Sequence, residues 1–216
     1  MLLFTASAVI FYSCEKEYID DSIEQKDVTI GTFTEVVKFY QNGNKLIEES
    51  ELLITETTSL IVVNPKIVYV FDNDEDLLTW GTTRDLCSEI TSVKNEVMEK
   101  HLAIEKFRSE VKVRGIVDNE EALQALYNEM FAYKNNERGA GILSSEKDGK
   151  GSLLPILGTY WRMPRGWDNR ASSIVASATT VLCSRTWFRG TRIYVLLHIG
   201  INLEDYDFDN QTSSIF

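Results

Sequence analysis

A six-residue segment that occurs twice near the end of the chain constrains the fold more than any other feature. The copies are Asp168-Asn169-Arg170-Ala171-Ser172-Ser173, which precedes Ile174, and Asp209-Asn210-Gln211-Thr212-Ser213-Ser214, which precedes Ile215. Such an internal repeat predicts two copies of one structural unit. Both copies carry carboxylate, amide and hydroxyl oxygens at matching positions, so we expect each copy to supply half of a shared site.

The charge and composition of the chain exclude several classes of function. The 216 residues include 33 acidic and 22 basic side chains, for a net charge of −11. This argues against a nucleic-acid partner, which needs a basic surface, and is compatible with cations. With two histidines and three cysteines, a metal site built on those residues is not expected. No nucleotide-binding loop or catalytic triad is indicated, so a non-enzymatic protein is predicted.

The start of the chain resembles a bacterial lipoprotein signal. Residues 1–13 are apolar or small, Cys14 follows directly, and the sequence then becomes acidic. The apolar run is shorter than the roughly 20 residues of a membrane-spanning helix. The resemblance, to lipoproteins of Bacteroidetes-type bacteria, implies a lipidated Cys14 and anchoring by acyl chains in the cell envelope, on the periplasmic side or at the surface. A buried strand is the alternative. Residues 15–30 are predicted to be a polar tether.

An α+β region is predicted over residues 31–137. Its first half consists of β-branched and alternating runs separated by turn residues such as Asn42-Gly43-Asn44, which indicates a hairpin followed by two further strands. We expect these strands to form a small antiparallel sheet. They cover residues 34–40, 45–55, 60–63 and 66–71.

Helices are expected to follow the strands. Asp72-Asn73-Asp74 precedes further acidic residues, which is typical of a capped helix start. The segment also resembles the beginning of an EF-hand loop, but Leu77 and Thr83 occupy the positions that require glycine and glutamate. Apolar residues then recur at helical spacing over residues 86–111, and a further helix is predicted after Asp118. His101, within the long helix, is interpreted as an ordinary helix residue.

An all-β unit is predicted over residues 140–216. Helical spacing ends before Gly141, and short β-prone runs separated by glycines follow. The polar run at 134–139 is a plausible boundary between the two parts. The predicted fold is therefore an α+β region followed by an all-β domain.

The repeat is similar to the (Asp/Asn)-(Asp/Asn)-X-X-(Ser/Thr)-Ser signature of calcium-binding microbial βγ-crystallins, and both copies match every constrained position. Residues 181–190 also resemble the first hairpin of that family. Phe188 and Gly190 match its aromatic and glycine positions, whereas Cys183 replaces its first aromatic residue. Residues 144–151 keep only the final glycine. The resemblance implies a double Greek-key sandwich over residues 140–216.

In that family each copy of the signature contributes oxygen ligands to two Ca²⁺ ions, and hard oxygen ligands suit calcium. The resemblance implies that one of the first two side chains, the third carbonyl and the fifth hydroxyl of each copy are ligands. These residues are Asp168, Asn169, Arg170 (carbonyl) and Ser172, and Asp209, Asn210, Gln211 (carbonyl) and Ser213. Further carbonyls are expected near Ser145–Glu146 and Ser184–Arg185. The sixth-position serines are expected to bind backbone groups of a hairpin.

The expected function is calcium binding by a non-enzymatic, lipid-anchored exported protein. Two alternatives remain open, a protease inhibitor of crystallin-like fold and a surface adhesin or substrate-binding lipoprotein with a protein or glycan partner. Trp161, Trp167 and Trp187 could bind a sugar, but we expect them in the core. Cys87 and Cys183 could pair, although two free thiols are expected.

Overall fold

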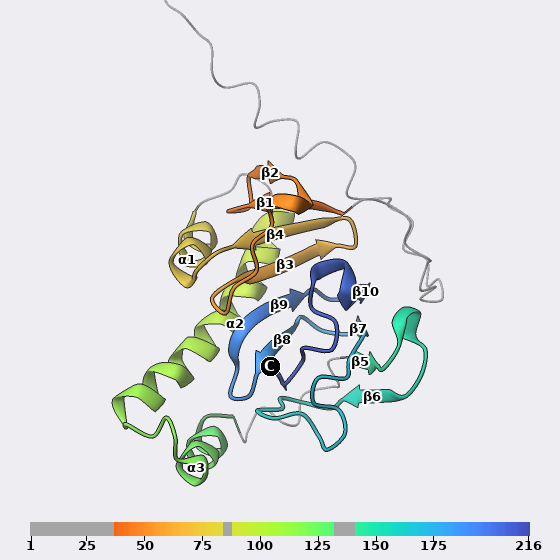
Figure 1. Cartoon of the computed structure of the whole chain (residues 1–216). Helices are drawn as coiled ribbons and strands as arrows, with labels where there is room; N and C mark the ends of the chain where they lie inside the picture. Colours follow the sequence, from red (N-terminus) through yellow and green to blue (C-terminus); the bar gives the residue numbers. More distant parts are fainter. Residues whose placement is uncertain (1–36, 84–87, 132–140) are drawn as a thin grey trace, which may run out of the picture.

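The chain has a mixed α+β fold with three α-helices and two mostly antiparallel sheets in the part that the structure describes (Figure 1). The computed structural model describes three ranges: residues 37–83, 88–131 and 141–216. Other predicted features lie outside these ranges, namely Cys14 with the signal segment before it, the tether at 15–30, Cys87 and the boundary at 134–139. None of the described helices is long and apolar enough to cross a membrane.

The first half contains four strands at the predicted places, but the second is shorter than the predicted 45–55 and residues 34–36 of the first lie outside the described range. β1 (Lys38–Gln41) pairs antiparallel with β2 (Lys45–Ile47), and β3 (Ser59–Asn64) pairs antiparallel with β4 (Ile67–Phe71). A short 3₁₀ helix, Glu49–Glu51, follows β2. The prediction of a wholly antiparallel sheet is wrong, because β1 lies parallel to β4. This arrangement places β4 at the centre of the first half, with a neighbour on each side.

Three helices follow β4. α1 (Asp74–Thr82) is capped by Asn73, whose side chain accepts a hydrogen bond from Asp76 N, so the predicted helix start is confirmed. α2 (Ser88–Val113) and α3 (Glu120–Phe131) correspond to the two later helices predicted from apolar spacing. Figure 1 shows α2 running along one side of the strands, with α3 near its C-terminal end.

The described chain from Gly141 onward contains strands and no α-helix, as predicted, together with short 3₁₀ helices that were not predicted. Four strands form the smaller sheet, in the order β10-β7-β5-β6. They are β5 (Gly141–Ser144), β6 (Leu153–Ile156), β7 (Ser173–Ala176) and β10 (Gly200–Asn202). The remaining three are β8 (Thr180–Arg185), β9 (Arg189–Val195) and β11 (Ser214–Ile215). Short 3₁₀ helices cover Lys147–Gly149 and Leu203–Tyr206.

One parallel pairing joins the two halves of the chain into a single seven-stranded sheet. β3 lies parallel to β9, with Ser59 opposite Arg192 and Val62 opposite Val195. The strand order of the sheet is β11-β8-β9-β3-β4-β1-β2. The α+β region and the all-β unit predicted from the sequence therefore share a sheet, and their buried apolar side chains form one core cluster.

Aromatic side chains pack the helices onto the seven-stranded sheet. The ring of Phe107 in α2 lies 5.7 Å from that of Phe188 and 6.1 Å from that of Trp187, between centroids. Phe131 of α3 adds a ring 6.2 Å from Phe188. Burial of this apolar area stabilises the contact between the helical layer and the β8–β9 hairpin.

Replacing Phe107 with alanine should destabilise both halves of the chain together. The side chain is 1% exposed, so its loss leaves a cavity and should lower the free energy of unfolding by about 3–5 kcal/mol. Urea unfolding followed by circular dichroism and by tryptophan fluorescence should give one shared transition at a lower midpoint. Leu102→Ala, at a 55% exposed position of the same helix, should change the midpoint little. Separate transitions for the two probes would contradict a common core.

Candidate functional site

The two copies of the hexapeptide lie against each other. Asn169 N donates a hydrogen bond to Thr212 O at 3.0 Å, and Asn210 N donates to Ala171 O at 3.0 Å. Each bond joins the second position of one copy to the fourth position of the other, so the pair has local two-fold symmetry. Asn169 and Asn210 both adopt left-handed backbone conformations, with φ of 54° and 53°, which asparagine tolerates better than most residues.

The serine at the sixth position of each copy binds a hairpin through its hydroxyl group, as predicted. Ser173 binds the β5–β6 hairpin of the first unit, and Ser214 binds the β8–β9 hairpin of the second unit. In both units the serine Oγ donates to a carbonyl of the hairpin and accepts from a backbone amide three residues further on. The contacts are Ser173 Oγ with Glu146 O (2.7 Å) and Gly149 N (3.2 Å), and Ser214 Oγ with Arg185 O (2.6 Å) and Phe188 N (3.1 Å). The two hairpins are therefore held in the same way.

The two hairpins also share their backbone conformation. Three residues at matching positions of each have positive φ. They are Asp148 (54°), Gly149 (70°) and Gly151 (76°), and Trp187 (60°), Phe188 (58°) and Gly190 (78°). A Cβ atom on Gly151 would lie 2.5 Å from Ser145 Oγ, and one on Gly190 would lie 2.3 Å from Ser184 Oγ. The positive φ and the close approach of this serine therefore both favour glycine at the last position of each hairpin. At the second of the three matching positions, Gly149 of the first hairpin corresponds to Phe188 of the second.

Segments of both units pair in each of the two sheets. β10, which follows the second hairpin, pairs with β7 of the first unit, with Ile201 opposite Ile174. In return Tyr160 of the first unit bridges Ile215 of the second, with N···O distances of 2.7 and 2.8 Å in the two directions. The two units are therefore interlocked by exchanged segments.

Predicted ligand oxygens from both copies meet at site 1, which consists of Asp168, Asn169 and Ser213. Ser213 Oγ donates to Asp168 Oδ1 at 2.7 Å and to Asn169 Oδ1 at 3.1 Å. The fifth-position hydroxyl of one copy thus lies beside the first two side chains of the other. Asp168 and Asn169 are exposed, so a dissolved ion has access to these oxygens.

Site 2 consists of the matching residues Asp209, Asn210 and Ser172. Asn210 Nδ2 donates to Asp209 Oδ2 at 2.6 Å. Asp209 Oδ1 is shielded from solvent, and no donor among the described residues reaches it. A shielded carboxylate oxygen without a donor is energetically costly, and a bound cation would relieve that cost.

A polar hollow of about 450 Å³ lies beside site 2. The first hairpin forms most of its wall, and Ser172 of site 2 contributes to it. The hairpin residues are Ser145, Glu146, Lys147, Asp148 and Lys150. Ser172 therefore shares this hollow with Ser145 and Glu146, the hairpin residues near which further carbonyl ligands are expected.

The third-position side chains take part in contacts of their own. The guanidinium of Arg170 lies 5.7 Å from the ring centroid of Trp167 and donates to Gly166 O at 3.4 Å. Gln211 Nε2 donates to Asp207 O at 2.8 Å. The ligand role expected for Arg170 and Gln211 concerns their backbone carbonyl groups, which these side-chain contacts do not involve.

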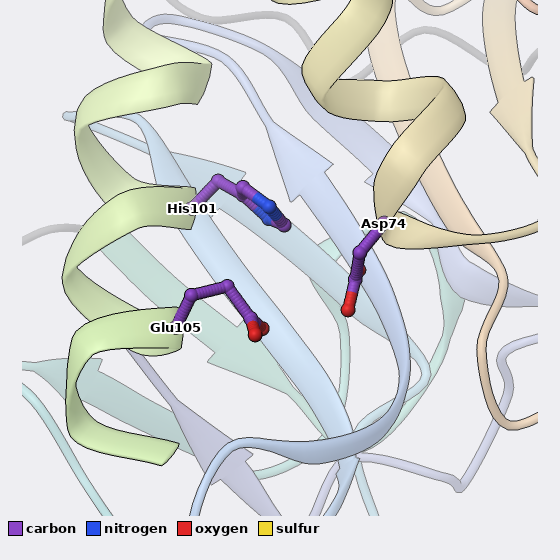
Figure 2. Close-up of side chains that lie close together, drawn as sticks. All are labelled: Asp74, His101 and Glu105. Carbon is purple, nitrogen blue, oxygen red and sulfur yellow. The ribbon is translucent and has the colours of Figure 1, made fainter. Parts of the chain in front are cut away.

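Sequence reasoning missed a partly buried polar cluster between α1, α2 and β9. Asp74, His101 and Glu105 point toward one another, with candidate ligand atoms within 4.8 Å (Figure 2). The side chain of Arg192, 2% exposed, forms an ion pair with Asp74 and donates to Glu105 Oε1 at 3.2 Å. Arg108 contacts the same two carboxylates, so the two guanidinium groups together compensate both negative charges. We therefore interpret the cluster as an ion-pair network that holds the helices to the sheet.

His101 is fully buried in this network, so its interpretation as an ordinary helix residue is wrong. Its Nδ1 lies 3.1 Å from Tyr194 Oη and 3.5 Å from Arg192 Nη1. Burial lowers the pKa of His101, and the positive charge of Arg192 lowers it further. The imidazole is therefore neutral at pH 7. Its partners lie about 90 residues away in the sequence, and no local pattern indicated them.

The tryptophans considered for sugar binding and the thiol of Cys183 are buried or partly buried. Trp187 is buried and stacks on the partly buried Trp161, with ring centroids 4.0 Å apart, and Trp167 is also partly buried. Cys183 is a buried free thiol, and burial raises its pKa to about 12. Its reactivity as a thiolate is therefore low. The partner considered for it, Cys87, lies outside the described residues.

Ser214→Ala should destabilise the protein, because the buried amide of Phe188 and the carbonyl of Arg185 both lose their side-chain partner. The expected loss is about 1–3 kcal/mol in the free energy of unfolding, measured by urea titration. Ser145→Ala, whose hydroxyl accepts from Ser152 N in a more exposed setting, is the matched control with a smaller effect. Equal effects for the two variants would contradict the structural role of the sixth position.

The network around His101 predicts that stability falls in mild acid. Because the folded-state pKa of His101 is depressed below the unfolded value near 6.5, the unfolded chain binds the proton more readily. The contribution of the neutral imidazole to the free energy of unfolding is therefore present above the unfolded pKa near 6.5 and is lost as the pH falls through and below that pKa. Urea titrations at pH 7 and pH 5 should show a smaller difference for His101→Gln than for the wild type. His198→Asn, at an exposed position with φ of 63°, should keep the wild-type difference.

No protein-family model, curated protein or solved structure matches this chain. The contacts of the described residues are therefore what distinguishes the candidate sites. Those contacts divide the candidates into two kinds. The paired hexapeptides have exposed residues and are rich in oxygen ligands, whereas the Arg192 cluster is partly buried and already charge-compensated.

Proposed function

We propose that residues 141–216 form a calcium-binding double Greek-key unit of the βγ-crystallin type, and that calcium stabilises its fold without a catalytic role. The observation that carries this proposal is the reciprocal pairing of the two hexapeptides. Asn169 binds Thr212 and Asn210 binds Ala171, so the signature residues of both copies come together. Residues that match a ligand signature only in sequence would have no reason to meet in this symmetrical way.

The chemistry of the assembled oxygens supports a hard divalent cation. Calcium takes six to eight oxygen ligands from carboxylates, amides, hydroxyls, carbonyls and water. Site 1 brings a carboxylate, an amide and a hydroxyl oxygen within hydrogen-bond distance of one another. Site 2 contains the shielded oxygen of Asp209 that has no donor among the described residues. Two sites of this kind would hold two ions, each shared between the copies.

The exchange of segments between the units supports the Greek-key part of the proposal. Each hairpin is followed by a segment that crosses to the sheet of the other unit, through Tyr160 in one direction and β10 in the other. The next segment, β7 or β11, returns to pair with the first strand of its own hairpin. Because the hexapeptides connect these segments, an ion bound between them would brace both units.

We further propose that the protein is attached to the bacterial cell envelope through a lipidated Cys14. This part of the proposal rests on the apolar run before Cys14 and the polar residues after it. An anchor of this kind would place the calcium-binding unit outside the cytoplasm, where calcium is available at higher concentration. Mass spectrometry of the protein from bacterial membranes would detect acyl chains on the peptide that begins with Cys14.

The double variant Asp168→Ala, Asp209→Ala should lose the stabilisation that calcium gives to the wild type. An ion that binds only the folded state stabilises it by about 2.7 kcal/mol at a concentration one hundred times its dissociation constant. Thermal unfolding with calcium and with a chelator should therefore show a rise in Tm for the wild type and little change for the double variant.

A matched control separates loss of ligands from loss of negative charge. Glu99→Ala with Asp118→Ala removes two exposed carboxylates from the helical layer, and this protein should respond to calcium as the wild type does. The site assignment is wrong if the Asp168, Asp209 variant responds to calcium like this control. Isothermal titration of the wild type should also give binding heat at millimolar calcium or below.

A further inference from the structure

The solvent face of the four-stranded sheet carries a row of residues without a polar side chain. In the register of the sheet, Gly200 of β10 stands opposite Val175 of β7, Val175 opposite Ile142 of β5, and Ile142 opposite Pro155 of β6. An antiparallel sheet with one solvated face usually places polar residues on that face. An apolar row that crosses all four strands is therefore a candidate interaction surface.

The row widens along β6 into what we call the outer patch, which consists of Ile142, Leu153, Pro155 and Leu157. Ile142 is 43% exposed, Leu153 is 56% exposed and Leu157 is 67% exposed. Leu153 and Pro155 share one face of β6 because side chains alternate along a strand, and Leu157 continues this alternation just after the strand. Figure 1 shows β5 and β6 on the side of the molecule away from α2.

The free edge of β6 is closed to a further strand, so the face of the sheet is what a partner can contact. β6 is the last strand in the order of its sheet. Pro155 has no amide hydrogen, and proline on an edge strand hinders pairing with another strand. Tyr160 Oη donates to Pro155 O at 3.5 Å and accepts from Leu157 N at 3.4 Å. These contacts occupy the main-chain groups that an added strand would need.

Basic side chains adjoin the outer patch. Arg170 Nη2 donates to Ser152 Oγ at 3.3 Å, which places the guanidinium beside the start of β6. Arg170 Nη1 donates to Gly166 O at 3.4 Å, so the turn that carries the exposed Arg165 lies next to it. Lys150, whose side chain is 71% exposed, comes shortly before β6 in the chain. We call Lys150, Arg165 and Arg170 the basic rim.

The surroundings of the basic rim distinguish it from the rest of the protein. Residues 141–170, which contain β5, β6 and the loop after them, hold five basic and three acidic side chains, although the whole chain has a net charge of −11. The partly buried ring of Trp167 lies 5.7 Å from the Arg170 guanidinium, between the ring centroid and Cζ. Tryptophan is enriched where an apolar and an aqueous phase meet. An apolar patch with a basic rim thus occurs in a chain that is acidic as a whole.

We infer that the outer patch and its basic rim form a docking surface for an anionic lipid bilayer. Apolar side chains that enter the headgroup region supply buried area, and basic side chains beside them are attracted to acidic lipids. A second copy of the chain fits this surface less well, because the basic rims of two copies would repel each other when the patches met. The inference goes beyond the proposed function and requires neither bound calcium nor a lipidated Cys14.

Leu153→Ser with Leu157→Ser tests the inference by sedimentation of the full chain with vesicles of phosphatidylcholine and phosphatidylglycerol. A chelator keeps calcium from bridging protein and lipid, and every variant keeps residues 1–36 unchanged. Loss of the two leucine side chains should weaken vesicle binding at least about tenfold, because the apolar area they would bury is lost. Leu53→Ser with Leu102→Ser is the matched control. It removes leucines that are 72% and 55% exposed on other surfaces, and its binding should stay within about twofold of the wild type.

The basic rim is tested separately by Lys150→Gln with Arg165→Gln. A basic residue near an anionic surface contributes about 1 kcal/mol, so each substitution should weaken binding about fivefold at low salt. The difference from the wild type should shrink as salt screens the attraction. On vesicles of phosphatidylcholine alone, this variant and the wild type should bind equally.

A spectroscopic readout and a stability measurement accompany the binding data. Brominated lipids should quench more of the tryptophan emission in the wild type than in Trp167→Phe, because the bilayer contacts the ring at that position. The Leu153, Leu157 variant should unfold thermally close to the wild-type Tm, since both side chains are exposed. Equal vesicle binding by this variant and its leucine control overturns the inference. A dimer that forms without vesicles and is lost in the same variant assigns the surface to a second copy and overturns the lipid assignment.

Discussion

The two reciprocal main-chain hydrogen bonds between the hexapeptides are the contact on which the C-terminal unit depends. They bring together segments that begin at residues 168 and 209, and they do so at residues whose backbone is left-handed. Once these segments pair, Ser173 and Ser214 each reach the hairpin of their own unit. The hydroxyl group of Ser213 then reaches the side chains of Asp168 and Asn169 in the other copy. The same geometry thus serves packing and ligand placement.

A second constraint joins this unit to the rest of the chain. The parallel pairing of β3 with β9 extends the sheet across the molecule, and α2 covers β9 with Phe107, Glu105 and His101. The Arg192 cluster lies at this junction, where a guanidinium with almost no solvent exposure is held by carboxylates from α1 and α2. Breaking one member would leave an uncompensated buried charge, so this network specifies how the helices are placed on the sheet.

Local patterns were sufficient for most elements and for the repeat. The cap at Asn73, the helical spacing of α2 and α3, and the turns around Gly151 and Gly190 depend on neighbouring residues, and the structure contains each of them. The backbone-binding role of Ser173 and Ser214 was also predictable, because both serines belong to the repeated hexapeptide. The parallel pairings of β1 with β4 and of β3 with β9 were not, because strand order depends on contacts between distant segments.

The sequence by itself determined that two equivalent oxygen-rich segments exist, which residues they contain and that short strands surround them. Only the tertiary structure decided that the segments face each other and that His101 is buried beside Arg192. The physical reason is that propensity, capping and turn chemistry act over a few residues. Charge compensation and burial depend on which distant side chains the fold brings together.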